Sequence, residues 1–158
     1  FARVVQETLA ETGLSADRLE LEITESVLLQ DRGDDLAALR SLRESGVSIA
    51  LDDFGTGFAS MSYLKRFPFD RLKIDRFFVT DAPRDPGSAA IVAATIQLAR
   101  AYDIEVTAEG VETYEQYQTL RAAGVKLMQG YLFGRPDQIT DGLPRIETAV
   151  SIAAGRVA

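Results

Sequence analysis

Short apolar runs alternate with longer amphipathic segments along this chain, and each apolar run is bounded by turn-forming or charged residues. Short apolar runs are typical of strands, and apolar positions spaced three or four apart are typical of helices. The pattern predicts strands over residues 19–23, 47–51, 72–74, 104–108 and 125–129. It predicts helices over residues 34–44, 60–66, 88–102, 113–123 and about 143–154, and the end of another helix over residues 1–9. Residues 81–87, with two prolines and a glycine, form the only stretch that resembles a linker.

Strands separated by helices at this spacing predict an α/β fold with a parallel sheet and right-handed crossovers. An open doubly wound sheet and a (β/α)₈ barrel both fit this alternation. A barrel needs about 250 residues, or about 31 for each βα unit. The 158 residues would therefore supply about five of the eight units. We expect residues 1–158 to form a single domain.

Charged residues occur near the C-terminal ends of four successive predicted strands. Alternate side chains of a strand point to opposite faces. In each of the four strands the charged residue lies opposite the aliphatic residues: Glu22, Asp52, Lys73 and Glu109. Any one of them alone is more typical of a solvated strand end. Together they would converge at the C-terminal end of a barrel, where barrel enzymes carry out their chemistry.

The composition restricts which metal ligands such a site could use. The chain contains no cysteine and no histidine, so any metal would be held by oxygen atoms, which favours Mg²⁺, Mn²⁺ or Ca²⁺. Asp52 and Asp53 are adjacent at the end of an apolar run, which fits either an acidic turn or a divalent-metal site. The net charge of −7 argues against a nucleic-acid polymer as partner. We expect no membrane segment, because no apolar run approaches about 20 residues, and we see no signal-peptide pattern.

Three further polar residues have two interpretations each. Glu112 follows Glu109 by three residues, and either joins the same site or is an acid favoured at a helix start. Glu25 lies in Thr24-Glu25-Ser26, a sequence that fits helix capping, so a structural role is favoured for it over a place in the site. Gln129 shares a strand face with aliphatic residues, so it points inward only if they do.

Six segments carry a resemblance to a known family: Glu22-Ile-Thr-Glu25, Asp52-Asp-Phe-Gly-Thr-Gly57, Tyr63-Leu-Lys-Arg-Phe-Pro68, Leu72-Lys-Ile-Asp75, Glu109-Gly-Val-Glu112 and Gln129-Gly-Tyr-Leu-Phe133. In this order and spacing, from about Leu19 to Pro136, they closely resemble the EAL-domain family. Members of this family are phosphodiesterases of bacterial second-messenger signalling, which open cyclic di-GMP to linear pGpG. The resemblance implies a (β/α)₈ barrel with one antiparallel strand.

The resemblance also implies metal ligands. Two divalent ions, Mg²⁺ or Mn²⁺, would be held by four carboxylates, with one aspartate bridging both: Glu22, Asp52 (bridging), Asp53 and Glu109. Metal ions that lower the pKa of bound water would explain why the chemistry needs no histidine.

The remaining implied roles concern the reacting groups and the loop beside them. Lys73 would contact the attacking water or a phosphate oxygen, and Glu109 would act as, or assist, the general base. Glu112 would orient the water, and Gln129 would contact water or substrate. Glu25 would brace the loop 54–59, which positions Asp53 and shapes the surface of an expected homodimer.

Two family features lie outside the match. The Glu-Ala-Leu motif and an asparagine ligand belong before Leu19, on strands that this chain does not contain. The chain thus resembles the C-terminal two-thirds of the domain, with the first three strands missing rather than mutated. We expect this chain alone to be inactive and weakly stable, because two open sheet edges remain.

The parent protein is expected to be cytoplasmic, with or without a membrane tether in another domain. A cyclic di-GMP receptor or protein-interaction module without turnover is the alternative function. The retained carboxylates, lysine and glutamine favour the enzyme. Another Mg²⁺-dependent barrel enzyme fits the six segments less well.

Overall fold

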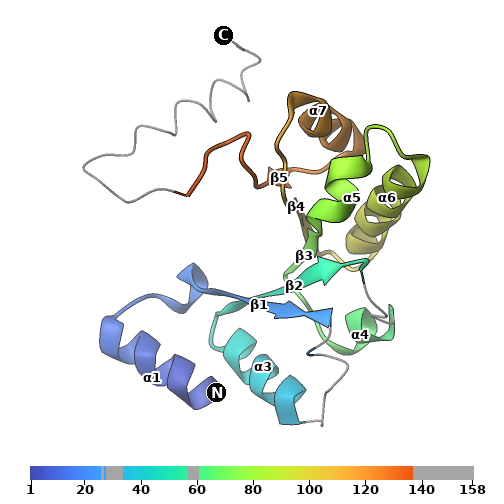
Figure 1. Ribbon diagram of the computed structural model, residues 1–158. Coiled ribbons are helices and arrows are strands. Elements are labelled where there is room, and N and C mark those ends of the chain that lie inside the picture. Colours follow the sequence, from blue (N-terminus) through green and yellow to red (C-terminus); the bar gives the residue numbers. More distant parts are fainter. Residues whose placement is uncertain (26, 28–33, 57–60, 137–158) are drawn as a thin grey trace.

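Five parallel strands form one sheet in sequential order, as the computed structural model shows (Figure 1). The structure describes residues 1–136 except 26, 28–33 and 57–60. The strands are β1 (Glu20–Thr24), β2 (Ser48–Phe54), β3 (Arg71–Ile74), β4 (Glu105–Ala108) and β5 (Leu127–Met128). The parallel α/β sheet predicted from the sequence is confirmed.

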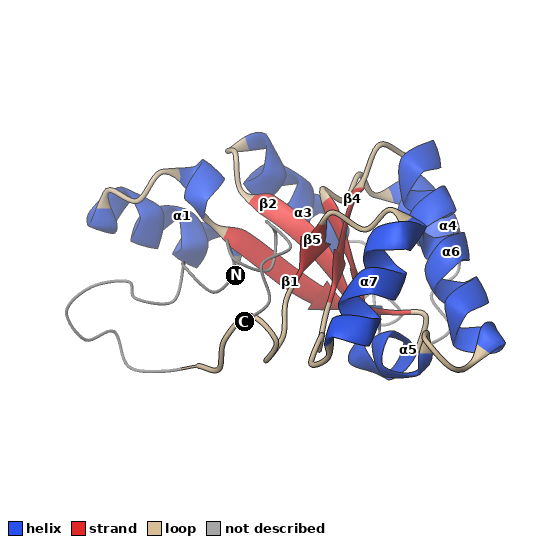
Figure 2. Ribbon diagram, turned by 90° about the horizontal axis from the view of Figure 1, so that it is seen from above, coloured by secondary structure: helices blue, strands red, loops and turns tan. Residues whose placement is uncertain are grey.

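Helices connect the strands and cover one face of the sheet. They are α1 (Ala2–Thr12), α3 (Asp34–Glu44), α4 (Met61–Arg66), α5 (Arg76–Asp81), α6 (Pro86–Ala101) and α7 (Tyr114–Ala123), with the 3₁₀ turn η1 (Ala16–Arg18) before β1. Because neighbouring strands are consecutive and crossovers are right-handed, every crossover helix falls on the same side. Figure 2 shows the helices wrapped around the outer side of the curved sheet, which leaves the inner face open.

Two apolar clusters fill the space between the sheet and the helices. The first lies between β1, β2 and β3 and the helices α3 and α4, and includes the fully buried Leu42, Ile49 and Phe67. The second joins β3 and β4 to α5, α6 and α7, and includes the fully buried Ile74 and Leu120. Because the aliphatic side chains of the strands face these clusters, the alternate side chains face inward.

Most predicted boundaries shift by one to three residues, and larger differences occur at α5, β2 and β5. Helix α5 was not predicted, although its N-cap carries a clear signal: the Asp75 side chain accepts a hydrogen bond from Phe77 N at 2.7 Å. Strand β2 extends to Phe54, so both adjacent aspartates lie within it, and β5 has only two residues. The helix predicted near residues 143–154 lies outside the described residues. Within the described part, no helix has the length and apolar character needed to cross a membrane.

Candidate active site

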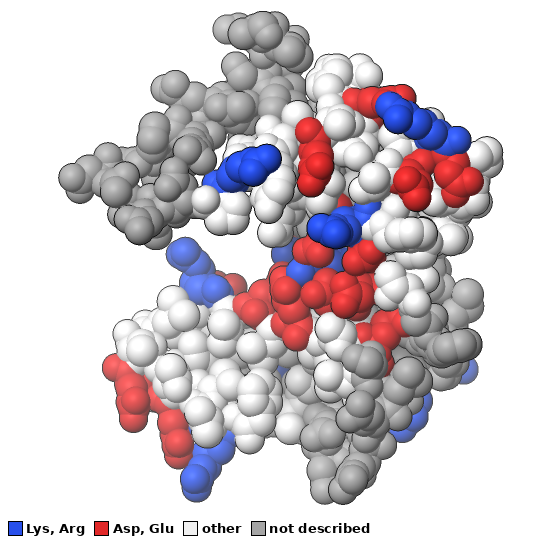
Figure 3. All heavy atoms as spheres, viewed as in Figure 1, with Lys and Arg blue, Asp and Glu red and all other residues white. Residues whose placement is uncertain are grey.

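Lys73 lies at the centre of a group of carboxylates on the inner face of the sheet. Its Nζ is 2.6 Å from Glu22 Oε1, 2.7 Å from Glu109 Oε1 and 3.4 Å from Asp52 Oδ1. These residues come from β1, β2, β3 and the end of β4, so strand order and side-chain alternation together bring them to one point. Figure 3 shows the acidic side chains gathered in the hollow of this face. The convergence predicted from strand parity is therefore present.

The charges in this group alter one another's protonation. Burial alone would lower the pKa of Lys73, but its hydrogen bonds to Glu109 and Glu22 raise that pKa above the usual lysine value. Burial raises the pKa of Glu109, and Lys73 partly opposes that rise. The lysine is therefore firmly protonated, and Glu109 holds a proton more readily than an ordinary glutamate.

Asp53 occupies an irregular point of β2. The register between β2 and β3 shifts between Leu51 and Phe54, and Asp53 has a left-handed φ of 55°. A bulge of this kind redirects a side chain. The carboxyl group of Asp53 meets that of Asp75, and burial together with Asp52 and Asp75 raises its pKa.

Asp75 is thus a member of the site to which the sequence assigned no role. Its side chain serves both as the N-cap of α5 and as a hydrogen-bond partner of Asp53. Its place two residues after Lys73, in the segment Leu72-Lys-Ile-Asp75, was the available signal. Two carboxyl groups in contact need a shared proton or a cation between them.

Glu25 contacts the loop that follows Asp53. It is 5% exposed, and its Oε1 accepts a hydrogen bond from Gly55 N at 3.1 Å. This contact agrees with the bracing role expected for Glu25. Residues 57–59 of the predicted loop lie outside the described residues.

The turn after β4 carries Glu109 and Glu112 and is tied to the end of β5. Val111 N donates to Gln129 O at 3.0 Å, and Leu132 N donates to Val111 O at 3.0 Å. A Cβ on Gly130 would lie 2.2 Å from Val111 O, so the two segments approach more closely than a side chain permits. Glu112 and Gln129 are both exposed beside this junction.

Strand alternation applies only in part near Gln129. Met128 packs against the outer apolar cluster, which places Leu127 on the inner side, but Val125 also belongs to that cluster and β5 ends at Met128. Glu112 precedes the N-cap residue of α7, Thr113, so it follows the strand rather than opening the helix.

The acidic side chains of this site are suitable ligands for a divalent cation. Carboxylates are the ligands that Mg²⁺ and Mn²⁺ prefer, and Glu22, Asp52 and Glu109 already surround the positive charge of Lys73. Among the described residues, however, no three side chains stand in a ready arrangement for holding an ion.

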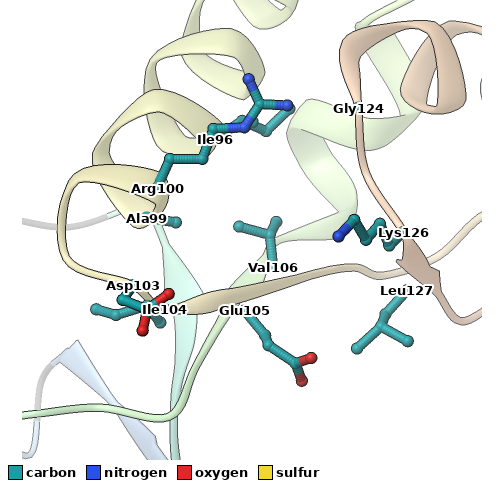
Figure 4. Close-up of a pocket in the computed structure, with 10 residues that line it drawn as sticks. All are labelled: Ile96, Ala99, Arg100, Asp103, Ile104, Glu105, Val106, Gly124, Lys126 and Leu127. Carbon is teal, nitrogen blue, oxygen red and sulfur yellow. The ribbon is translucent and has the colours of Figure 1, made fainter.

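At the opposite ends of the strands, where they begin, acidic residues pair with an arginine instead of a lysine. Arg71 pairs there with Glu20 at 3.0 Å and with Glu105 at 2.9 Å. A cavity of about 360 Å³ lies beside this end, between α6, β4 and β5 (Figure 4). Its lining includes Arg100 and Lys126 and none of the predicted site residues. The cavity is thus separate from the carboxylate group.

The chain is similar to known proteins of one family. A family model described as "EAL domain" matches residues 1–136. The chain is 46% identical over 132 residues to the cyclic di-GMP phosphodiesterase NbdA of Pseudomonas aeruginosa, covering 84% of this chain and 17% of that protein. It spans about a fifth of the length of the curated relatives it matches.

Solved structures share the fold. A c-di-GMP complex of the PaMucR phosphodiesterase superposes with a TM-score of 0.80 at 42% identity, over 85% of this chain and 55% of that one. A manganese and cyclic di-GMP complex of Klebsiella pneumoniae BlrP1 gives a TM-score of 0.78 at 36% identity, over 84% of this chain and 34% of that one. The sheet described above therefore corresponds to part of a larger barrel domain in these structures.

Proposed function

Because the chain belongs to the EAL domain family, we propose that it forms part of a metal-dependent phosphodiesterase that hydrolyses cyclic di-GMP to linear pGpG. One observation carries this proposal: carboxylates from three separate strand ends converge on the buried Lys73. Such a concentration of negative charge is costly unless cations compensate it. The NbdA and PaMucR proteins, named as phosphodiesterases, support the choice of substrate.

Four residues would hold the metal ions, Mg²⁺ or Mn²⁺: Glu22, Asp52, Asp53 and Glu109. When bound, divalent ions lower the pKa of a coordinated water and neutralise charge on the phosphodiester. The manganese complex of BlrP1 supports divalent-metal use in this family.

The protein's own side chains would supply the remaining chemistry. Lys73 is held protonated, so its Nζ can donate a hydrogen bond to a phosphoryl oxygen or to the attacking water. Glu109 has a raised pKa and is suited to accept a proton from that water. Glu112 and Gln129, exposed at the junction of the β4 and β5 ends, would orient water and substrate.

The partners follow from the same proposal. Cyclic di-GMP is the ligand, and the protein acts in the cytoplasm as a homodimer whose surface includes the loop 54–59. Catalysis would require the strands that complete the domain in its solved relatives, because this chain covers only 55% of the PaMucR structure.

A matched pair of substitutions tests the site. Asp53 and Asp103 are both non-glycine residues with left-handed φ, 55° and 56°, so Asn at either position meets the same backbone demand. Asp103 lines the distant cavity. The test uses this chain extended to the complete domain seen in its solved relatives. In that protein, we expect Asp53→Asn to reduce the formation of pGpG with Mn²⁺ by about 100-fold or more. Asp103→Asn should leave the rate near wild type.

Two outcomes would contradict the proposal. Equal rates in the Asp53→Asn and wild-type proteins would remove Asp53 from the site. Tight binding of cyclic di-GMP by the wild-type domain without linear product would favour the receptor function instead.

A further inference from the structure

The turn between β4 and α7 presents Glu109 and Glu112, and its geometry depends on a glutamine further along the chain. We propose that Gln116 is a positioning residue: its amide oxygen holds the main chain at Glu112 and so fixes the position of the Glu112 side chain for hydrolysis. This inference rests on the proposed function, because Glu112 has a catalytic role only there.

Gln116 lies under the turn rather than on the surface of its helix. It is 7% exposed, although it belongs to the first turn of α7. Its Oε1 accepts hydrogen bonds from Glu112 N at 2.7 Å and from Thr113 N at 2.9 Å. One buried oxygen thus satisfies two consecutive backbone N–H groups.

This arrangement exceeds what a helix start requires. In a capping box the residue at the third helical position bonds back to the N-cap N–H, which is Thr113 N here. The reciprocal bond runs from Gln116 N to Thr113 Oγ1 at 3.2 Å. The additional and shorter bond reaches Glu112, which precedes the cap, and it adds a constraint on the catalytic turn itself.

The backbone of the turn has further anchors, which join main-chain groups. Glu109 N donates to Ile74 O at 3.1 Å, and Val111 N donates to Gln129 O at 3.0 Å. Such bonds persist through most side-chain substitutions. The bond to Glu112 N comes from a side chain, so a change at Gln116 can release this end of the turn while the other anchors remain.

Three substitutions in the domain extended to the length of its relatives separate positioning from simple stability. Gln116→Met keeps the size of the side chain and removes the acceptor. Gln116→Glu keeps an acceptor for both N–H groups. Thr113→Ala breaks the other half of the capping box and leaves the Glu112 bond in place.

The kinetic expectation follows from misplacement of Glu112. Gln116→Met should lower kcat for cyclic di-GMP by about 10- to 100-fold with little change in KM, because displacement of catalytic groups by about 1 Å has effects of this size. Gln116→Glu should restore most of kcat, and Thr113→Ala should stay near wild type. Equal losses of kcat in Gln116→Met and Thr113→Ala would overturn the proposal, since both would then reflect helix stability.

Amide hydrogen exchange at Glu112, measured by NMR without metal, gives a readout independent of activity. We expect faster exchange in Gln116→Met and slow exchange in Thr113→Ala. Unchanged exchange in Gln116→Met would also overturn the proposal. If the wild-type domain forms no pGpG, the proposed function fails, while the exchange data still decide whether Gln116 holds the turn.

Discussion

Replacing Lys73 with methionine removes the central positive charge of the carboxylate group. The side chain of Lys73 is 6% exposed, and three carboxylates lie within 3.4 Å of its Nζ. Removing one partner of a buried ion pair costs about 3–5 kcal/mol, because the remaining charge is left uncompensated. The Glu22 side chain is 47% exposed and can turn toward water, so we expect a loss near the lower limit, about 3 kcal/mol at neutral pH.

Urea unfolding of the extended domain in EDTA measures this loss, with Lys65→Met as the control for an exposed lysine on α4. Added Mn²⁺ should recover part of the deficit, because a bound cation replaces the missing charge. The deficit should also shrink as the pH falls from 7 toward about 5. Burial already raises the pKa of Glu109, and without Lys73 nothing in the group opposes that rise, so the folded state binds more protons than the unfolded state and gains stability in acid. A Lys73→Met protein within about 0.5 kcal/mol of wild type in EDTA would refute this electrostatic account.

Three further predictions concern the scaffold. Arg71→Met should reduce stability by about 1 kcal/mol, an effect that diminishes in 1 M NaCl, because the ion pairs with Glu20 and Glu105 are partly exposed; no salt dependence would contradict this. Asp85→Asn should lower the melting temperature at pH 7, since hydrogen bonds from Ser88 lower the pKa of Asp85. This stabilisation is present above the unfolded pKa and is lost as the pH falls through the folded pKa, so the two melting curves should merge in acid; a constant gap would argue against it. Gly130→Ala should cost about 3 kcal/mol in chemical unfolding, because its Cβ would meet Val111 O at 2.2 Å, and a neutral effect would show that the two segments separate freely.

Strand alternation was sufficient to predict the centre of the site. The apolar residues of each strand had to face the helices, so Glu22, Asp52, Lys73 and Glu109 had to face inward. The bounds of α3 also matched, because its leucines repeat with helical spacing before Gly46. Both predictions depend on periodicity, which the sequence records directly.

The features that the sequence did not reveal depend on contacts between distant residues. Helix α5 has only six residues, too few for a helical period to be distinct. The left-handed φ of Asp53 follows from a register shift against β3, which no residue type specifies. Asp75 and Gln116 gained their roles from neighbours brought together by folding, namely Asp53 and the backbone of Glu112.

The sequential strand order has a consequence for protein synthesis. Each strand pairs with the strands just before and after it in the chain, so the sheet can grow in the order in which the ribosome releases it. Glu22 and Asp52 can then become neighbours before Lys73 has left the ribosome. A nascent sheet of two strands carries uncompensated negative charge, and Lys73 of β3 offsets part of it. Pairing of β3 would therefore stabilise the sheet formed by β1 and β2 during translation.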